Sequence, residues 1–100
     1  MYDMKNLAKF EKYGKLAPEA FRAFVAFDEL AYKAGAIPAK YKELMAVAVA
    51  LTTQCPYCIE IHAKKAKIAG ATQEELAETA IVAAAIRAGG AMTHGTHTLE

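Results

Sequence analysis

Two cysteines, a histidine and a glutamate are the residues of this sequence whose types and spacing could do chemistry. Cys55 and Cys58 stand in the run Cys55-Pro56-Tyr57-Cys58, and His62 follows four residues later. Residues three or four apart on a helix share a face, with Cβ atoms about 5–6 Å apart. Two sulfurs so placed can bond and separate with little movement, next to a group that can accept a proton.

The proline predicts how the cysteines meet the start of a helix. Pro56 suits the first helical position, which makes Cys55 the N-cap and puts Cys58 within the first turn. A helix N-terminus favours negative charge and so stabilises a cysteine thiolate. This effect alone favours Cys55 as the nucleophile. His62, one turn beyond Cys58, is instead a specific base for Cys58.

Glu43 joins this group if the helices before and after Thr53 pack as an antiparallel hairpin. At 1.5 Å per residue, Glu43 and His62 are then both about 10–15 Å from the bend. A carboxylate on a buried face beside His62 would orient the imidazole and favour its charged form. We therefore expect a proton relay from Glu43 through His62 to Cys58, with Cys55 beside it.

The elements that must position these residues are all predicted to be helices, because apolar residues recur at spacings of three and four rather than alternating. Gly14, Gly35, Gly70 and the Gly89-Gly90 pair are expected to mark helix ends. Thr72 with Glu75 is predicted to form a capping box. The expected helices are about 3–13, 18–34, 38–52, 55–70 and 72–88, with one more short turn possible from 91.

One hundred residues without a linker indicate a single domain over 1–100, with its core at about 17–90. The run Leu44–Leu51 and the segment Ala80–Ile86 lack a polar face, and such helices are normally buried on all sides. The sequence thus predicts an all-α bundle of five to six helices. Since exposed apolar bands promote aggregation, we also expect an obligate homo-oligomer.

Composition excludes several classes of function. The net charge of +1 gives no electrostatic case for binding nucleic acid. Met1–Lys5 is not followed by the apolar stretch of a signal peptide, and Leu44–Leu51 is far shorter than the roughly 20 residues of a membrane helix. We expect a cytoplasmic protein, in which thiols are kept reduced.

Other roles for the cysteine pair remain open. A zinc site would need further ligands, for which the chain offers only His62, His94 and His97. Inert core thiols are a second alternative. A structural disulfide is disfavoured, because so short a loop contributes only about 2 kcal/mol and the compartment would reduce it. Covalent haem attachment is excluded, because Ile59 rather than histidine follows the second cysteine.

The full pattern resembles a known superfamily. Glu43, eleven intervening residues, Cys55-x-x-Cys58, three more residues and His62 are similar to the AhpD-like alkylhydroperoxidase branch of the carboxymuconolactone decarboxylase-like superfamily. The flanking residues 59–66 and 70–76 look similar too, and the likeness covers about 17–90. AhpD itself carries histidine between its cysteines, where this chain has Tyr57.

The resemblance implies an all-helical fold that assembles as trimers or hexamers. It implies a dithiol enzyme that reduces peroxides or disulfides without a cofactor, and that a lipoyl-bearing or thioredoxin-like protein re-reduces. Cys58 would be the attacking thiolate, Cys55 the resolving one, and His62 and Glu43 the proton acceptor and relay. Lactone decarboxylation is an alternative activity, although the true decarboxylases of the superfamily lack the cysteine pair.

Overall fold

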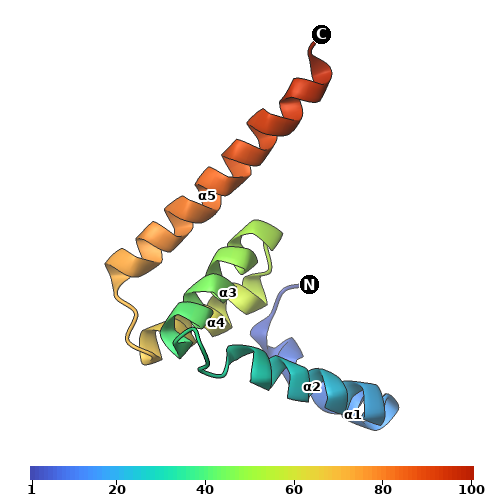
Figure 1. Cartoon of the computed structure of the whole chain (residues 1–100). Helices are drawn as coiled ribbons and strands as arrows, with labels where there is room; N and C mark the ends of the chain where they lie inside the picture. The colour runs from blue at the N-terminus through green and yellow to red at the C-terminus, as the bar shows by residue number, and fades with distance from the viewer.

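The computed structural model describes all 100 residues and contains only helices. The all-α prediction is therefore confirmed. Figure 1 shows an antiparallel hairpin of two helices from which the other helices extend as arms. In chain order the elements are η1 (Met4–Lys9), α1 (Phe10–Leu16), α2 (Pro18–Tyr32), α3 (Ala39–Thr53), α4 (Pro56–Ile68), α5 (Gln73–Gly95) and η2 (Thr96–Thr98).

The α3–α4 hairpin turns at a single left-handed residue. Gln54 has φ 57° and ψ 45°, and it ends α3 by donating its backbone N–H to the carbonyl of Ala50. Cys55 and Pro56 then start α4 as N-cap and first helical residue, as predicted. Because only two residues separate the helices, α4 must fold back along α3.

One helix-stop prediction, at the end of α4, and one helix-start prediction, at the beginning of α5, are confirmed. Gly70 follows α4 with φ +100°, a conformation that glycine adopts without a Cβ clash. The capping box is complete, since the Thr72 side chain accepts from Glu75 N–H at 3.0 Å and the Glu75 carboxylate accepts from Thr72 N–H at 2.9 Å. These features set the direction in which α5 leaves the hairpin.

Two other helix-stop predictions are wrong. The first helical region continues past Gly14 to Leu16 and breaks at Ala17, because the residue before a proline is pushed out of the helical region. Helix α5 runs through Gly89 and Gly90 to Gly95. A glycine costs about 1 kcal/mol relative to alanine in a helix, which the good helix formers on both sides offset.

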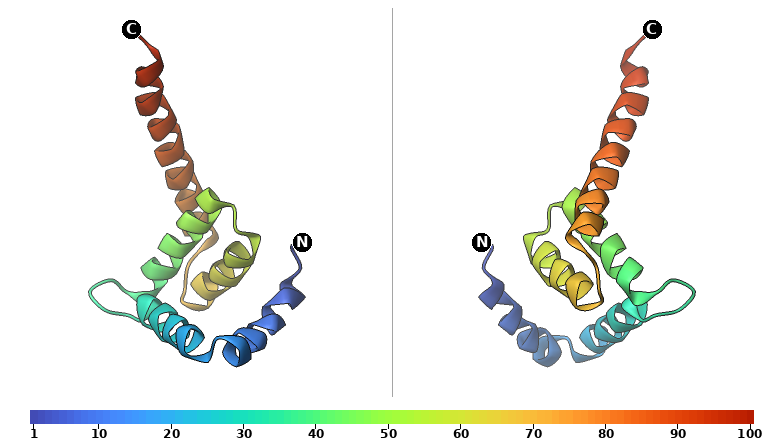
Figure 2. Two further views of the ribbon diagram at one scale, coloured as in Figure 1. Left: turned by 90° about the vertical axis from the view of Figure 1, so that its right-hand side faces the viewer. Right: turned by 90° about the vertical axis from the view of Figure 1, so that its left-hand side faces the viewer.

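The expectation that the two apolar helices are buried on all sides is also wrong for the single chain. In α5 only Ala83 is buried, while Ile81, Val82 and Ile86 are 62–71% exposed. Figure 2 shows why, since most of α5 projects beyond the hairpin. The Cα radius of gyration is 16.7 Å, against about 13 Å for a compact domain of this length.

Candidate active site

The hairpin brings Glu43 and His62 together as the hairpin geometry predicts. Glu43 Oε2 and His62 Nδ1 lie 2.6 Å apart, and both residues are buried. Because a carboxylate only accepts, Nδ1 carries the proton, which leaves Nε2 as the ring's proton acceptor when the imidazole is neutral. These are the only two buried residues with polar or charged side chains, so each is the other's partner in an apolar setting.

The two sulfurs lie side by side at the start of α4. Cys55 Sγ and Cys58 Sγ are 2.6 Å apart, both thiols are free, and both residues are part-exposed. Cys55 Sγ also accepts the backbone N–H of Cys58 at 3.4 Å, as an N-cap side chain does. A pair held this close can pass between dithiol and disulfide without movement of the helices.

The surroundings shift the pKa values of the two thiols in opposite directions. Hydrogen bonds from the Cys58 thiol and from backbone N–H groups lower the pKa of Cys55. The hydrogen bond to Cys55, followed by burial, raises the pKa of Cys58 to about 11. The dithiol therefore loses its first proton at Cys55, as the helix-terminus argument predicts. Attack by Cys58, the nucleophile that the resemblance implies, therefore requires a base such as His62.

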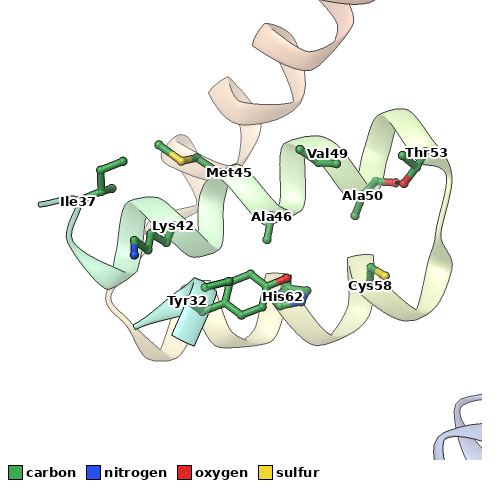
Figure 3. Close-up of a pocket in the computed structure, with 11 residues that line it drawn as sticks. Tyr32, Ile37, Lys42, Met45, Ala46, Val49, Ala50, Thr53, Cys58 and His62 are labelled. Atoms are coloured by element: carbon green, nitrogen blue, oxygen red, sulfur yellow. Dashed lines mark hydrogen bonds between the residues drawn. The ribbon is translucent and has the colours of Figure 1, made fainter. Parts of the chain in front are cut away.

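A largely apolar cavity of about 420 Å³ connects Cys58 with His62 (Figure 3). Met45, Ala46 and Val49 of α3 form its opposite wall. The structure shows no hydrogen bond between His62 and either sulfur, so the predicted relay is continuous from Glu43 to His62 only. The cavity has room for water molecules, through which a proton could pass from Cys58 to His62 Nε2.

Tyr32 belongs to this site and was not predicted from the sequence. Its ring lies 4.6 Å from the His62 ring, centroid to centroid, at an interplanar angle of 39°. Burial raises the pKa of its hydroxyl, with further contributions from Asp28, Glu43 and Cys58. The phenol, tilted against the imidazole, therefore stays neutral and restricts the rotation of the His62 ring. No sequence signal marks Tyr32, because its contact depends on how the end of α2 crosses the hairpin.

The histidines proposed as additional zinc ligands lie elsewhere. His94 and His97 have ring centroids 5.5 Å apart at the end of α5, which extends away from the hairpin that carries the cysteines. No group of three or more Cys, His, Asp or Glu side chains is arranged to hold a metal ion. None of the helices is long and apolar enough to cross a membrane.

Comparison with known proteins identifies the family to which this fold and site belong. Residues 18–100 match the model of the carboxymuconolactone decarboxylase family, and the chain is a member of that family. A carboxymuconolactone decarboxylase family protein from Legionella pneumophila has a similar crystal structure, with a TM-score of 0.75 and 38% identity over 80% of this chain and 71% of that one.

Other relatives extend the likeness without adding a function. A crystal structure of a protein from Methanobacterium thermoautotrophicum gives a TM-score of 0.81 at 36% identity, covering 88% of this chain and 99% of that one. "Uncharacterized protein 4 in cox locus" of Paracoccus denitrificans is 47% identical over 77% of this chain and 69% of its own length. An uncharacterized protein of Cupriavidus necator is 38% identical over 82% of this chain and 71% of its own length.

Proposed function

We propose that this protein is a thiol–disulfide oxidoreductase that reduces a peroxide or a disulfide with the Cys55–Cys58 dithiol. The observation that carries the proposal is the buried Glu43–His62 pair, 2.6 Å between Oε2 and Nδ1, whose His62 lines the same cavity as Cys58. A buried histidine that is hydrogen-bonded to a carboxylate and shares a cavity with two adjoining free thiols is what dithiol chemistry needs. If the two cysteines were inert core thiols, the Glu43–His62 pair would have no role in their chemistry.

In the first step His62 Nε2 accepts the Cys58 proton and the thiolate attacks the oxidant. With a hydroperoxide, the Cys58 sulfur takes the terminal oxygen, the O–O bond breaks, and the alkoxide leaves with the proton from His62. With a disulfide, the products are a mixed disulfide on Cys58 and a released thiol. A base is required because the pKa of Cys58 is raised to about 11.

In the second step the Cys55 thiolate attacks the oxidised Cys58 sulfur. The intramolecular disulfide forms, and hydroxide or the second thiolate leaves and is protonated. The lowered pKa of Cys55 makes it available as a thiolate at this step. It also makes Cys55 a good leaving group when a reductant attacks Cys58. A dithiol such as a reduced lipoyl or thioredoxin-like protein would restore both thiols and become a disulfide itself.

The pKa values and the positions of the two cysteines favour different residues as the attacking nucleophile. Cys55 ionises first, but Cys58 lines both cavities that His62 lines, of about 420 and 600 Å³, whereas Cys55 lines only the larger one. We give Cys58 the attacking role because a thiol with a raised pKa becomes the stronger nucleophile once its proton is removed. The second thiol then resolves the adduct without a base of its own.

The experiment treats the reduced protein with hydrogen peroxide, cumene hydroperoxide and hydroxyethyl disulfide in turn, with dihydrolipoamide as reductant. We expect at least one oxidant to convert both thiols to an intramolecular disulfide, seen as the loss of two hydrogen atoms by mass spectrometry, with repeated turnover. A His62→Gln variant should slow this by about 10²- to 10⁴-fold, the usual range for losing an acid–base group. Thiols that survive every oxidant would refute the proposal.

We also propose that the working form is a homo-oligomer, a trimer or hexamer by resemblance. The accessible surface of one chain is 7818 Å², against about 5,500 Å² for a compact monomer of this mass. The excess of roughly 2,000 Å² is of the size that obligate interfaces bury. The exposed Ile81, Val82 and Ile86 of α5 are the side chains that such an interface would cover.

A further inference from the structure

Tyr57, the residue between the cysteines that follows Pro56, directs its hydroxyl away from the sulfurs and toward the beginning of the chain. The hydroxyl accepts the backbone N–H of Asp3 at 3.1 Å and Nδ2 of Asn6 at 3.0 Å. It donates to the carbonyl of Met1 at 3.2 Å. One donated and two accepted bonds use the full capacity of a phenol. The middle of the Cys-x-x-Cys run thus anchors residues more than 50 positions earlier.

A second tyrosine strengthens this attachment. The rings of Tyr2 and Tyr57 meet edge to face with centroids 4.7 Å apart. The Tyr2 hydroxyl donates to Glu60 Oε2 at 3.2 Å. Asn6 Nδ2 also donates to the Met1 carbonyl at 2.8 Å, which closes the segment on itself. Residues Met1–Asn6, here called the N-terminal strap, are therefore attached to the first turns of α4 at several points.

The N-terminal strap positions an apolar surface opposite Cys55 and Cys58. This surface, here called the wall, consists of Leu7, Phe10 and Tyr13. The strap includes the first residues of η1, and the rest of η1 and α1 run across from α4, as Figure 2 shows. Leu7, Phe10 and Tyr13, together with the polar Asn6 and Lys9, line a cavity of about 600 Å³ whose other side includes Cys55, Cys58 and His62. All three wall residues precede residue 18, where the match to the family model begins. The wall is thus an addition to the part of the chain that the family model describes.

We propose that Tyr57 positions this wall and that Leu7 and Phe10 select, among oxidants, those with a bulky apolar body. The inference rests on the proposed function for its catalytic meaning, but the wall and its contacts stand on the geometry alone. An apolar group held at the sulfurs would bury surface against Leu7 and Phe10. A small oxidant such as hydrogen peroxide gains nothing from them. The expected discrimination is about 3- to 30-fold, at the lower end of or below the roughly 10- to 200-fold that one methylene contributes in a hydrophobic pocket, because the side chain of Phe10 is partly exposed.

The test uses two maleimides with the same reactive group and different bodies, so it does not depend on catalysis. The rates at which N-phenylmaleimide and N-methylmaleimide label the reduced protein are measured, and their ratio is divided by the ratio for glutathione. We expect the normalised ratio to exceed one in the natural protein. It should fall about 3- to 10-fold in Leu7→Ala and in Tyr57→Phe, which keeps the ring and removes the three hydroxyl bonds. Tyr41→Phe, in α3 and outside this cavity, is the matched control.

Each outcome decides one part of the inference. A normalised labelling ratio that is unchanged in both variants would refute the proposed role of the wall. A ratio that rises would also refute it, because it would show that the N-terminal segment obstructs access to the thiols. A fall in Leu7→Ala alone would keep the wall and overturn the positioning role of Tyr57. In an active enzyme the kcat/KM ratio for cumene hydroperoxide over hydrogen peroxide should move in the same direction. Consumption of no oxidant at all would refute the proposed function and leave the maleimide result to decide the wall.

Discussion

The α3–α4 hairpin and the arms that extend from it differ in how many of their residues are buried within a single chain. Five of the six buried residues belong to the hairpin, among them Glu43 and His62, and the sixth is Ala83 in α5. The helices before the hairpin contain no buried residue, although they carry most of the aromatic side chains. The proposed chemistry thus lies in the part that folds against itself, while the arms leave large apolar side chains exposed in the single chain.

The largest expected effect comes from removing one sulfur of the hairpin. Cys58→Ser should abolish turnover, because a hydroxyl cannot take its place as nucleophile or form the disulfide. Cys55→Ser should allow one round of oxidation and trap a sulfenic acid or mixed disulfide on Cys58. Mass spectrometry after one equivalent of peroxide distinguishes the two. An adduct on Cys55 in Cys58→Ser, with none on Cys58 in the reverse variant, would exchange the roles of the sulfurs.

The buried Glu43–His62 pair of the hairpin can be weakened without changing its shape. Glu43→Gln keeps a hydrogen-bond acceptor for His62 Nδ1–H and removes the charge that stabilises imidazolium. Oxidation should slow about 10- to 1,000-fold, and alkylation of Cys58 should shift to higher pH. Circular dichroism should show unchanged helicity. If the rates of oxidation and of Cys58 alkylation depend on pH in the same way in the natural protein and in Glu43→Gln, Glu43 has no role in the mechanism.

The arms are tested by placing a charge on their exposed apolar surface. Ile81→Glu should weaken self-association by at least about 100-fold, because an unpaired carboxylate is costly to bury at an interface. Sedimentation at micromolar concentration should show an oligomer for the natural protein and a chain of 10.8 kDa for the variant. Thr52→Glu, a comparable charge at the end of the hairpin, serves as the control. A monomer of the natural protein would contradict the proposed assembly.

A smaller effect is expected for the hairpin in the pH dependence of thiol alkylation. Because the pKa of Cys55 is lowered and that of Cys58 is raised to about 11, Cys55 should react first as pH rises. In Cys55→Ser the neighbouring thiolate is gone, and the pKa of Cys58 should fall from about 11 toward the usual value near 8.5. Site-resolved iodoacetamide labelling across pH 6 to 11 measures both. Equal midpoints for the two cysteines would show that the environment does not separate them.

The smallest effect is expected where the hairpin meets the α5 arm. Thr72→Ala removes one half of the capping box and should cost about 1 kcal/mol in the free energy of unfolding. Labelling rates at Cys55 and Cys58 should not change, since the cap contacts neither. Thermal or urea unfolding provides the measurement. Thr98→Ala, near the end of the chain, should leave stability unchanged.

Much of the hairpin was predictable from local rules. Pro56 and Gly70 bound α4 through their own backbone preferences, and Thr72 with Glu75 start α5 through short-range hydrogen bonds. The pairing of Glu43 with His62 was also predictable, because a two-residue connection leaves adjacent helices little choice but antiparallel packing. Glycine alone predicted a helix end correctly at Gly70 but wrongly at Gly14 and Gly89, where the neighbouring residues favour a continuing helix.

Only the tertiary structure places the side chains that come from distant parts of the chain. The contact of Tyr32 with His62 and the bonds of Tyr57 to the N-terminal strap depend on how α2 and η1 cross the hairpin. The ionisation order of the cysteines likewise depends on distances of a few ångströms and on burial. The sequence by itself determined the helices, their turns and the reactive residues, because these follow from neighbours in the chain. The walls of the site and the exposure of the arms were decided by packing between segments that no local pattern encodes.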